Sequence, residues 1–205
     1  NILGIIIGNA ELAYEDIPDW SPARASLKEI KATSLRARDI VRQLLSFSRK
    51  TEPEKKPIKI GPIIEESKKL LRSFIPSSIE LRTNITKDTG TVNADPTQVH
   101  QVLINLCMNG VHAMEESGGI LEINLAEIQL EEKDVLNDPE KNLGPYVRLQ
   151  VKDTGHGMEK DVIDRIFDPY FTTKEVGKGT GMGLAVVHGI VQSHNGFIEV
   201  RSTLE

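Results

Sequence analysis

Six glycines gathered in two short clusters constrain this chain of 205 residues more than any other feature. The first cluster is Gly155 and Gly157, shortly after Asp153, and the second is the run Gly177-x-Gly179-x-Gly181-x-Gly183. Glycine backbone can approach a ligand closely because it carries no Cβ. The second cluster comes directly before a helical pattern that begins near Leu184, and free amides at the start of a helix bind phosphate oxygens. The clusters therefore predict a nucleotide site.

Each cluster also has another explanation. The Asp153 carboxylate suits the exocyclic amine of adenine, because it only accepts hydrogen bonds. A turn of the Asp-x-Gly kind, closed by that carboxylate, would explain the same residues without a ligand. The second cluster matches part of the dinucleotide-binding turn of Rossmann folds, but that turn follows an early strand, whereas a long loop with Pro169 precedes this one. We interpret the loop as a lid over a bound nucleotide.

A third polar group lies on a helix predicted to start at Asp95-Pro96. Asn105, Asn109 and His112 are spaced at i, i+4 and i+7, so they share one face of that helix. An amide oxygen is a suitable ligand for a Mg²⁺ ion that bridges phosphates. The equally weighted alternative is that Asn109 is a polar residue on a solvent-facing surface.

The first 50 residues have the pattern of a helical hairpin. A helix over 1–15 is followed by a break at 16–20, and Ser21-Pro22 provides an N-cap and a first helical turn. The second helix carries a heptad seam of apolar and small residues, namely Leu27, Ile30, Ser34, Ala37, Val41, Leu44 and Ser48. We expect residues 1–50 to pair with a second copy in a dimeric four-helix bundle. The alternative is a hairpin packed only on its own second domain.

Residues 51–57 are polar with two prolines and are predicted to be a linker, and 58–205 a second domain. Its patterns predict strands at 58–60, 78–85, 91–94, 119–129, 146–152 and 197–201, helices at 62–74, 95–114, 160–166 and 183–194, and a surface hairpin insertion at 131–144. This order is typical of a two-layer α/β sandwich with a mixed sheet, so the whole chain is predicted to be α+β.

Composition excludes several classes of function. The net charge of −5, with lysine and arginine thinly spread, offers no basic stripe, so nucleic acid is not an expected partner. No apolar run approaches the roughly 20 residues that span a membrane, so these residues are not expected to contact one. The single Cys107 provides neither a disulfide nor a cysteine-rich metal site and fits a reducing, cytoplasmic compartment. Asn1 stands within a helical pattern, so we expect a longer protein, whose attachment to a membrane is left open.

In this order the motifs resemble the dimerisation, phosphotransfer and catalytic ATP-binding domains of sensor histidine kinases, whose ATP-binding domain has the Bergerat fold. The resemblance covers nearly the whole chain. Residues 105–113 match the asparagine box, 153–158 the first glycine box, 167–171 the phenylalanine box and 179–183 the second glycine box, while the hairpin matches the dimerisation module.

The resemblance implies ATP and Mg²⁺ as cofactors. It implies a base pocket at Asp153, Gly155 and Gly157, Mg²⁺ on Asn109, and a phosphate end formed by Asn105, His112, Thr173, Lys174, Gly179, Gly181, Gly183 and Leu184. Asn109, Lys174 and His112 would be the catalytic residues. Many relatives have Lys or Arg at the position of His112.

The resemblance also implies a reaction. The γ-phosphoryl group would pass from ATP to a histidine upstream of Asn1 and then to an aspartate in the receiver domain of a response regulator. All five histidines lie in the predicted ATP-binding domain, so this chain is expected to bind Mg·ATP without phosphorylating itself. One rival is an ATPase clamp such as gyrase, which places a water-activating Glu where this chain has Asn105. Another is a nucleotide-binding module without catalysis.

Overall fold

The computed structural model describes residues 2–48, 54–72, 74–135, 141–174 and 180–204, with the backbone alone at 2, 36–48 and 134. The chain divides into two compact units, Asn1–Glu52 and Pro53–Glu205, and each is described by itself. Across these described ranges, no helix has both the length and the apolar character that crossing a membrane requires.

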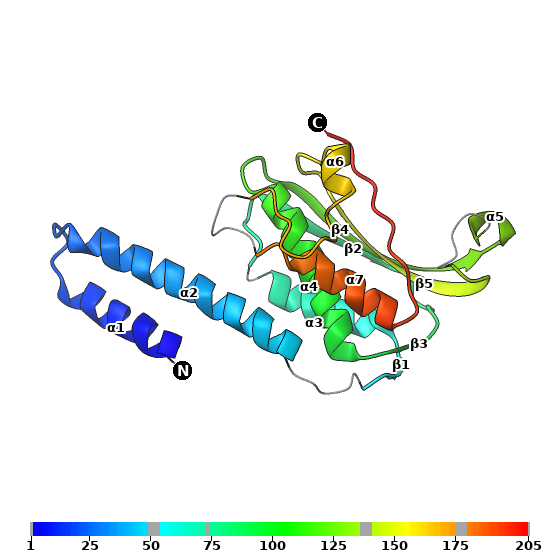
Figure 1. The fold of residues 1–205 in the computed structure, drawn as a ribbon, viewed down its shortest axis with the longest axis horizontal. Coiled ribbons are helices and arrows are strands. Elements are labelled where there is room, and N and C mark those ends of the chain that lie inside the picture. The colour runs from blue at the N-terminus through cyan, green and yellow to red at the C-terminus, as the bar shows by residue number, and fades with distance from the viewer. Residues whose placement is uncertain (1, 49–53, 73, 136–140, 175–179, 205) are drawn as a thin grey trace. The chain divides into compact units, whose positions relative to one another are not determined.

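The first unit is a helical hairpin of α1 (Ile2–Asp16) and α2 (Ala23–Ser48) (Figure 1). The Ser21 hydroxyl accepts a hydrogen bond from the Ala23 amide (3.3 Å), as expected of a residue that caps the start of a helix. Arg24 fixes the turn: its guanidinium stacks 4.2 Å from the Tyr14 ring centre and pairs with Asp19 at 2.5 Å.

The predicted heptad seam is described over its first half. Ser34 is buried and Leu27 is half-buried within the hairpin, whereas Ile30 remains 45% exposed. The other seam residues, Ala37, Val41, Leu44 and Ser48, have side chains outside the described ones. Outside the seam, Ile5 and Leu12 of α1 are 65% and 61% exposed, so the hairpin leaves apolar surface open on its own.

The described residues of the second unit form two sheets. Strands β2 (Ile79–Ile85), β4 (Gly119–Leu130) and β5 (Gly144–Asp153) form a mixed sheet in that order, in which β2 and β4 are parallel and β4 and β5 antiparallel. Strands β1 (Lys56–Ile58) and β3 (Val92–Ala94) form a small antiparallel sheet.

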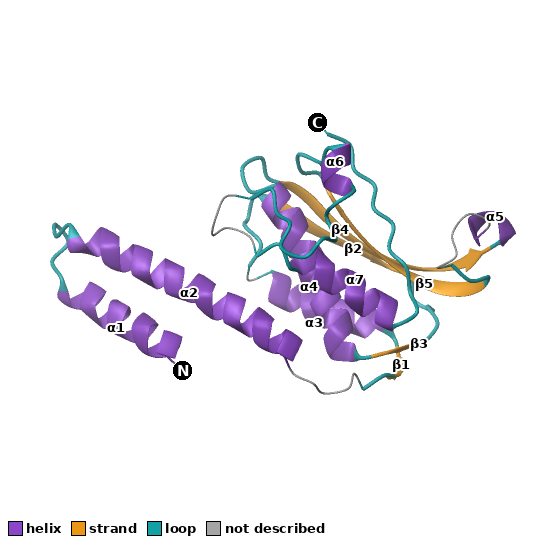
Figure 2. Cartoon of the chain, viewed as in Figure 1, coloured by secondary structure: helices purple, strands orange, loops and turns teal. Residues whose placement is uncertain are grey.

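Helices cover one face of the larger sheet, as Figure 2 shows. They are α3 (Ile60–Leu71), α4 (Pro96–Ala113) and α7 (Gly183–Ser193), with the short helices α5 (Glu132–Val135) and α6 (Lys160–Ile163) elsewhere. The main core lies between α3, α4 and the sheet and includes Ile64, Leu71, Leu103, Cys107, Met114, Leu121, Ile123 and Leu125. The other face carries polar side chains, for example Asn84, which donates to Glu122 and Asn124. The predicted two-layer sandwich with a mixed sheet is confirmed.

Two elements begin earlier than predicted. The strand predicted at 58–60 lies at Lys56–Ile58, and the helix predicted at 62–74 is Ile60–Leu71. Ile60 belongs to the helix because it is buried with Ile64, Ser67 and Leu71 on one face. Pro57 fits in β1 because, among the described residues, its sheet consists of β1 and β3, so each strand has a free edge.

The strand predicted at 197–201 does not form; this segment belongs to no ladder. Side-chain contacts hold it instead: the Phe197 ring meets Tyr146 of β5 edge-on at 5.5 Å, and Lys141 pairs with Glu199 at 2.7 Å. The predicted hairpin insertion links β4 directly to β5, whose ends pair at Leu130 and Gly144, and it contains α5.

Candidate nucleotide site

Helix α4 presents the predicted amide residues at its C-terminal half. Its start is fixed by Asp95, whose Oδ1 accepts from the amides of Thr97 (2.8 Å) and Gln98 (3.3 Å). Asn105 and Asn109 are half-buried one turn apart. Among the described residues no group is hydrogen-bonded to either side-chain amide, so both can accept a ligand.

Gly110 brings the end of β5 against α4. A Cβ at Gly110 would stand 2.8 Å from Leu121 Cδ1 and 3.1 Å from Asp153 Cβ, which is closer than side chains tolerate. The absence of that atom lets the Asp153 carboxylate lie beside the Asn109 turn of α4. Gly110 was not among the residues predicted from the sequence, although a glycine inside a helix is a signal of close packing.

The first glycine loop is tied to α4. Asp153 ends β5 and is exposed, and its Oδ1 accepts from the Gly155 amide at 2.9 Å, so the predicted capped turn is present. Its Oδ2 has no hydrogen bond within the described part of the chain and can still accept from a ligand. Gly155 packs on Ala113, where a Cβ would stand 2.6 Å from the carbonyl oxygen. Turn cap and ligand acceptor are thus compatible roles for one carboxylate.

Gly157 has the left-handed backbone conformation that favours glycine, with φ at 71°. A Cβ there would collide with the backbone of Thr203. The neighbouring Met158 amide donates to the Ser202 hydroxyl at 2.9 Å. Residues 202–203 therefore hold the first glycine loop, a role that no local pattern in the sequence reveals because the contact spans 44 residues.

The second glycine cluster leads into α7, and α7 begins beside Asn105. Gly183 is the first residue of α7, and a Cβ added to it would lie 3.6 Å from Asn105 Oδ1. Gly181 has a φ of 64° and its carbonyl accepts from the Tyr170 amide at 3.0 Å. Leu184 is half-buried, and Gly179 lies outside the described residues. The amides at the start of α7 thus stand beside the asparagine face of α4.

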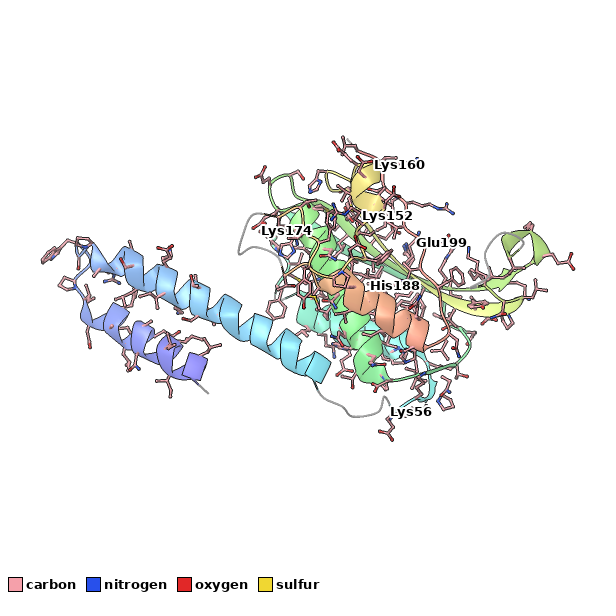
Figure 3. All side chains as sticks on the ribbon, in the orientation of Figure 1. Lys56, Lys152, Lys160, Lys174, His188 and Glu199 are labelled. Carbon is pink, nitrogen blue, oxygen red and sulfur yellow. The ribbon has the colours of Figure 1, made fainter. Side chains whose placement is uncertain are left out.

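Lys174 closes this end of the site. Its Nζ lies 2.9 Å from His112 Nδ1, and Figure 3 labels it near the end of α4. Its amide donates to Thr172 Oγ1 at 3.2 Å, so Thr172 shapes this turn, while the predicted Thr173 is exposed. Partial burial lowers the pKa of Lys174, against the Glu115 charge, which raises it. Burial first, and then the Lys174 charge, lower the pKa of His112.

Aromatic contacts hold the segment before Lys174. The Phe167 ring lies 5.1 Å from the His188 ring of α7, and the Arg165 guanidinium lies 4.4 Å from the Phe171 ring centre. His188 and Arg165 were not selected from the sequence, because these contacts depend on the tertiary fold. The two contacts hold Phe167 and Phe171, the first and last residues of the phenylalanine box.

No group of three or more His, Cys, Asp or Glu side chains within the described ranges could hold a metal ion. The Asn109 amide, with its free oxygen, nevertheless fits a hard cation such as Mg²⁺ whose other ligands are phosphates and water.

The comparisons with known proteins agree with this geometry. The model of the histidine kinase-, DNA gyrase B- and HSP90-like ATPase family matches residues 94–205. The chain belongs to this family. The matched range contains every predicted site residue, and the predicted resemblance to the ATP-binding domain of histidine kinases is confirmed.

Two similar proteins with sensor kinase names match nearly the whole length of the chain. Sensor kinase CckA of Brucella abortus (strain 2308) is 36% identical over 198 residues, which are 97% of this chain and 21% of CckA. Sensor histidine kinase ZraS of Escherichia coli (strain K12) is 32% identical over 203 residues, 98% of this chain and 40% of ZraS. The chain thus spans less than half of either relative.

Solved structures share the fold. Full-length ShkA in complex with AMPPNP matches 93% of this chain and 38% of ShkA with a TM-score of 0.66 and 23% identity. Histidine kinase ThkA in complex with response regulator TrrA matches 95% of this chain and 52% of ThkA with a TM-score of 0.61 and 22% identity.

Proposed function

We propose that this chain is the hairpin and ATP-binding part of a sensor histidine kinase in a two-component pathway. Residues 1–50 would form the dimerisation and phosphotransfer hairpin, 51–57 the linker, and 58–205 the catalytic domain that binds Mg·ATP. The last two residues of this linker, Lys56 and Pro57, already pair with β3 as part of β1. The observation that carries the proposal is the convergence of two free amides on α4, the free oxygen of Asp153 and the start of α7.

Each site residue has a role that its surroundings permit. Asp153 Oδ2 would accept from the adenine amine, with Gly155 and Gly157 shaping the base pocket. Asn109 would hold Mg²⁺, which supplies positive charge that neutralises the phosphates. Lys174 would add a cation at the phosphates, and Thr173 a hydroxyl. Asn105, Leu184 and the glycines at 179, 181 and 183 would enclose the phosphates, with His112 at the same end of the site beside Lys174.

Phosphoryl transfer is favoured over hydrolysis by the residue at position 105. Its amide cannot take a proton from water, and it stands one helical turn before Asn109, where related ATPase clamps have a glutamate. Asp153 is not proposed as that base, because its Oδ1 accepts from the Gly155 amide and its Oδ2 is assigned to the adenine amine, at the base-pocket end of the site. The kinase is therefore proposed over the ATPase clamp and over a module without catalysis.

The phosphoryl acceptor is proposed to be a histidine outside residues 1–205. None of the five histidines lies in the hairpin, since all are at position 100 or later. We therefore expect Mg·ATP binding without self-phosphorylation, and transfer onward to an aspartate of a response regulator. ThkA, which shares the fold, was solved with such a regulator. The hairpin would form a homodimer, and the chain would act in the cytoplasm.

Binding of ATP is tested by titration calorimetry with the unsubstituted chain and its variants. Asp153→Asn should weaken ATP binding by at least about tenfold, because it removes a charged acceptor. Asp88→Asn, at an exposed residue away from the site, should bind as the unsubstituted chain does. Asn109→Ala should weaken binding only when Mg²⁺ is present. Equal affinity of all variants would contradict the proposed site.

Catalysis is tested separately with γ-labelled ATP. Residues 1–205 should bind ATP yet retain no acid-labile label, whereas a longer version of the protein that includes the preceding helix should become labelled on histidine. A stable phosphohistidine on residues 1–205 would refute the acceptor assignment. Rapid release of phosphate by residues 1–205 would instead support the ATPase clamp.

A further inference from the structure

His112 and Lys174 meet although they are 62 residues apart. His112 lies in the last turn of α4, and Lys174 in the segment that leads to the second glycine cluster. Their nitrogens Nδ1 and Nζ are 2.9 Å apart. An ammonium group has three donors and no acceptor, so it must donate and Nδ1 must accept. The contact therefore requires a neutral His112 with its ring proton on Nε2.

Burial and the neighbouring Lys174 charge favour the neutral state of His112. Burial and the Lys174 charge both lower the pKa of His112, whereas the Glu115 carboxylate and a hydrogen bond to the Met108 backbone raise it. Glu115 also acts on Lys174 and favours its charged form. A neutral imidazole beside a retained ammonium is the arrangement that avoids two adjacent cations.

The backbone that carries Lys174 is held independently of His112. The Tyr170 amide donates to the Gly181 carbonyl (3.0 Å), and Thr172 Oγ1 accepts from the Lys174 amide (3.2 Å). The long lysine side chain itself would rotate freely without a hydrogen-bond partner, and fixing such a side chain costs rotamer entropy. Among the described residues, His112 provides the side-chain acceptor for the Lys174 ammonium group.

We propose that His112 is a positioning residue that holds the Lys174 ammonium ready at the phosphate end of the nucleotide site. The inference rests on the proposed function, because it takes the ligand to be a nucleotide with phosphates. It predicts that His112 acts through Lys174, affects only ligands that carry phosphates, and can be replaced by another acceptor of similar reach.

The experiment measures binding of ATP and of adenosine to five proteins. They are the unsubstituted chain, His112→Leu, His112→Gln, Lys174→Ala and the double variant that combines His112→Leu with Lys174→Ala. His112→Leu should weaken ATP binding about 3- to 10-fold, the effect of one lost hydrogen bond to a charged group in a partly exposed site. His112→Gln, which keeps an acceptor oxygen, should recover most of it. Adenosine affinity should be equal in all five.

The double variant separates positioning from structure. If His112 acts through Lys174, His112→Leu should cause no further loss once Lys174 is already replaced by alanine. The same loss in both backgrounds, or an equal loss for adenosine, would overturn the proposal and leave a structural role. Circular dichroism checks that every variant is folded.

A spectroscopic measurement tests the pair without any nucleotide. Nitrogen NMR of the unsubstituted chain should show His112 neutral with Nδ1 unprotonated, and Lys174→Ala should change the Nδ1 shift. A proton on Nδ1 would overturn the inference by itself. Absence of ATP binding by the unsubstituted chain would overturn the proposed function and this inference together, whereas intact binding without coupling between the two residues would overturn this inference alone.

Discussion

At the scale of single residues, the site depends on the close approach of α4 to the sheet as much as on its polar groups. Gly110→Ala would place a methyl group against buried Leu121 and against Asp153 Cβ, at 2.8 and 3.1 Å. Overpacking of this kind costs about 1–3 kcal/mol, more than the roughly 1 kcal/mol that alanine gains over glycine in a helix. We expect a net loss of stability in urea unfolding and weaker ATP binding, because Asp153 must shift.

Gly189→Ala is the matched control, since Gly189 lies in α7 with nothing within 4 Å of a Cβ. It should stabilise the chain by up to about 1 kcal/mol and leave ATP binding unchanged. If both alanines stabilise the chain alike, α4 is not packed as tightly on β5 as described.

His112 also makes stability depend on pH. Its pKa in the folded chain is lowered from 6.5, first by burial and then by the Lys174 charge. Between this lowered pKa and pH 6.5 the unfolded chain binds more protons than the folded chain does. The contribution of His112 to the free energy of unfolding is therefore fully present above pH 6.5 and is lost as the pH falls through the lowered pKa.

The measurement compares urea unfolding of the unsubstituted chain and His112→Gln from about pH 7.5 to about pH 5.5. The stability advantage of the unsubstituted chain should shrink over that range, while the other titrating groups cancel. An advantage that stays constant or grows would contradict the neutral state of His112.

At the scale of elements, the start of α4 joins three parts of the second unit. The Asp95 carboxylate accepts from the amides of Thr97, Gln98 and Glu54, and its own amide donates to His194 after α7. Asp95→Ala should therefore lower the free energy of unfolding by about 1–2 kcal/mol. Asp88→Ala, at an exposed loop, should change it by less than about 0.5 kcal/mol. Chemical denaturation of both variants checks this, and equal effects would exclude a capping role.

The elements also show what the sequence could and could not predict. The helix from Asp95-Pro96 and the strands ending at Leu130 and Asp153 were predicted well, because caps and apolar periodicity are local signals. The strand at 197–201 was wrong, because alternation cannot say whether a ladder partner is available. The contact of His112 with Lys174 was equally hidden, although both residues were selected separately, since nothing local relates positions 62 apart.

At the scale of the whole molecule, the two units should be separable. Every predicted site residue lies in Pro53–Glu205, which has its own core, so residues 53–205 alone should fold and bind ATP as well as the full chain does. Calorimetry on the two proteins checks this, and a tenfold or greater loss in the shorter one would mean that the hairpin contributes to the site.

The hairpin, in contrast, should determine the oligomeric state. It exposes Ile5, Leu12 and Ile30 by 65%, 61% and 45%, and apolar surface of this kind on a helical hairpin is normally covered by another copy. Sedimentation equilibrium should therefore give twice the chain mass for residues 1–205 and a single chain mass for 53–205. Ile30→Glu should shift the full chain toward monomer, because a carboxylate in a buried seam costs several kcal/mol. Glu29→Gln, on the neighbouring exposed position, should leave the dimer intact. A monomeric full chain would instead favour a hairpin that is covered by other parts of the same protein.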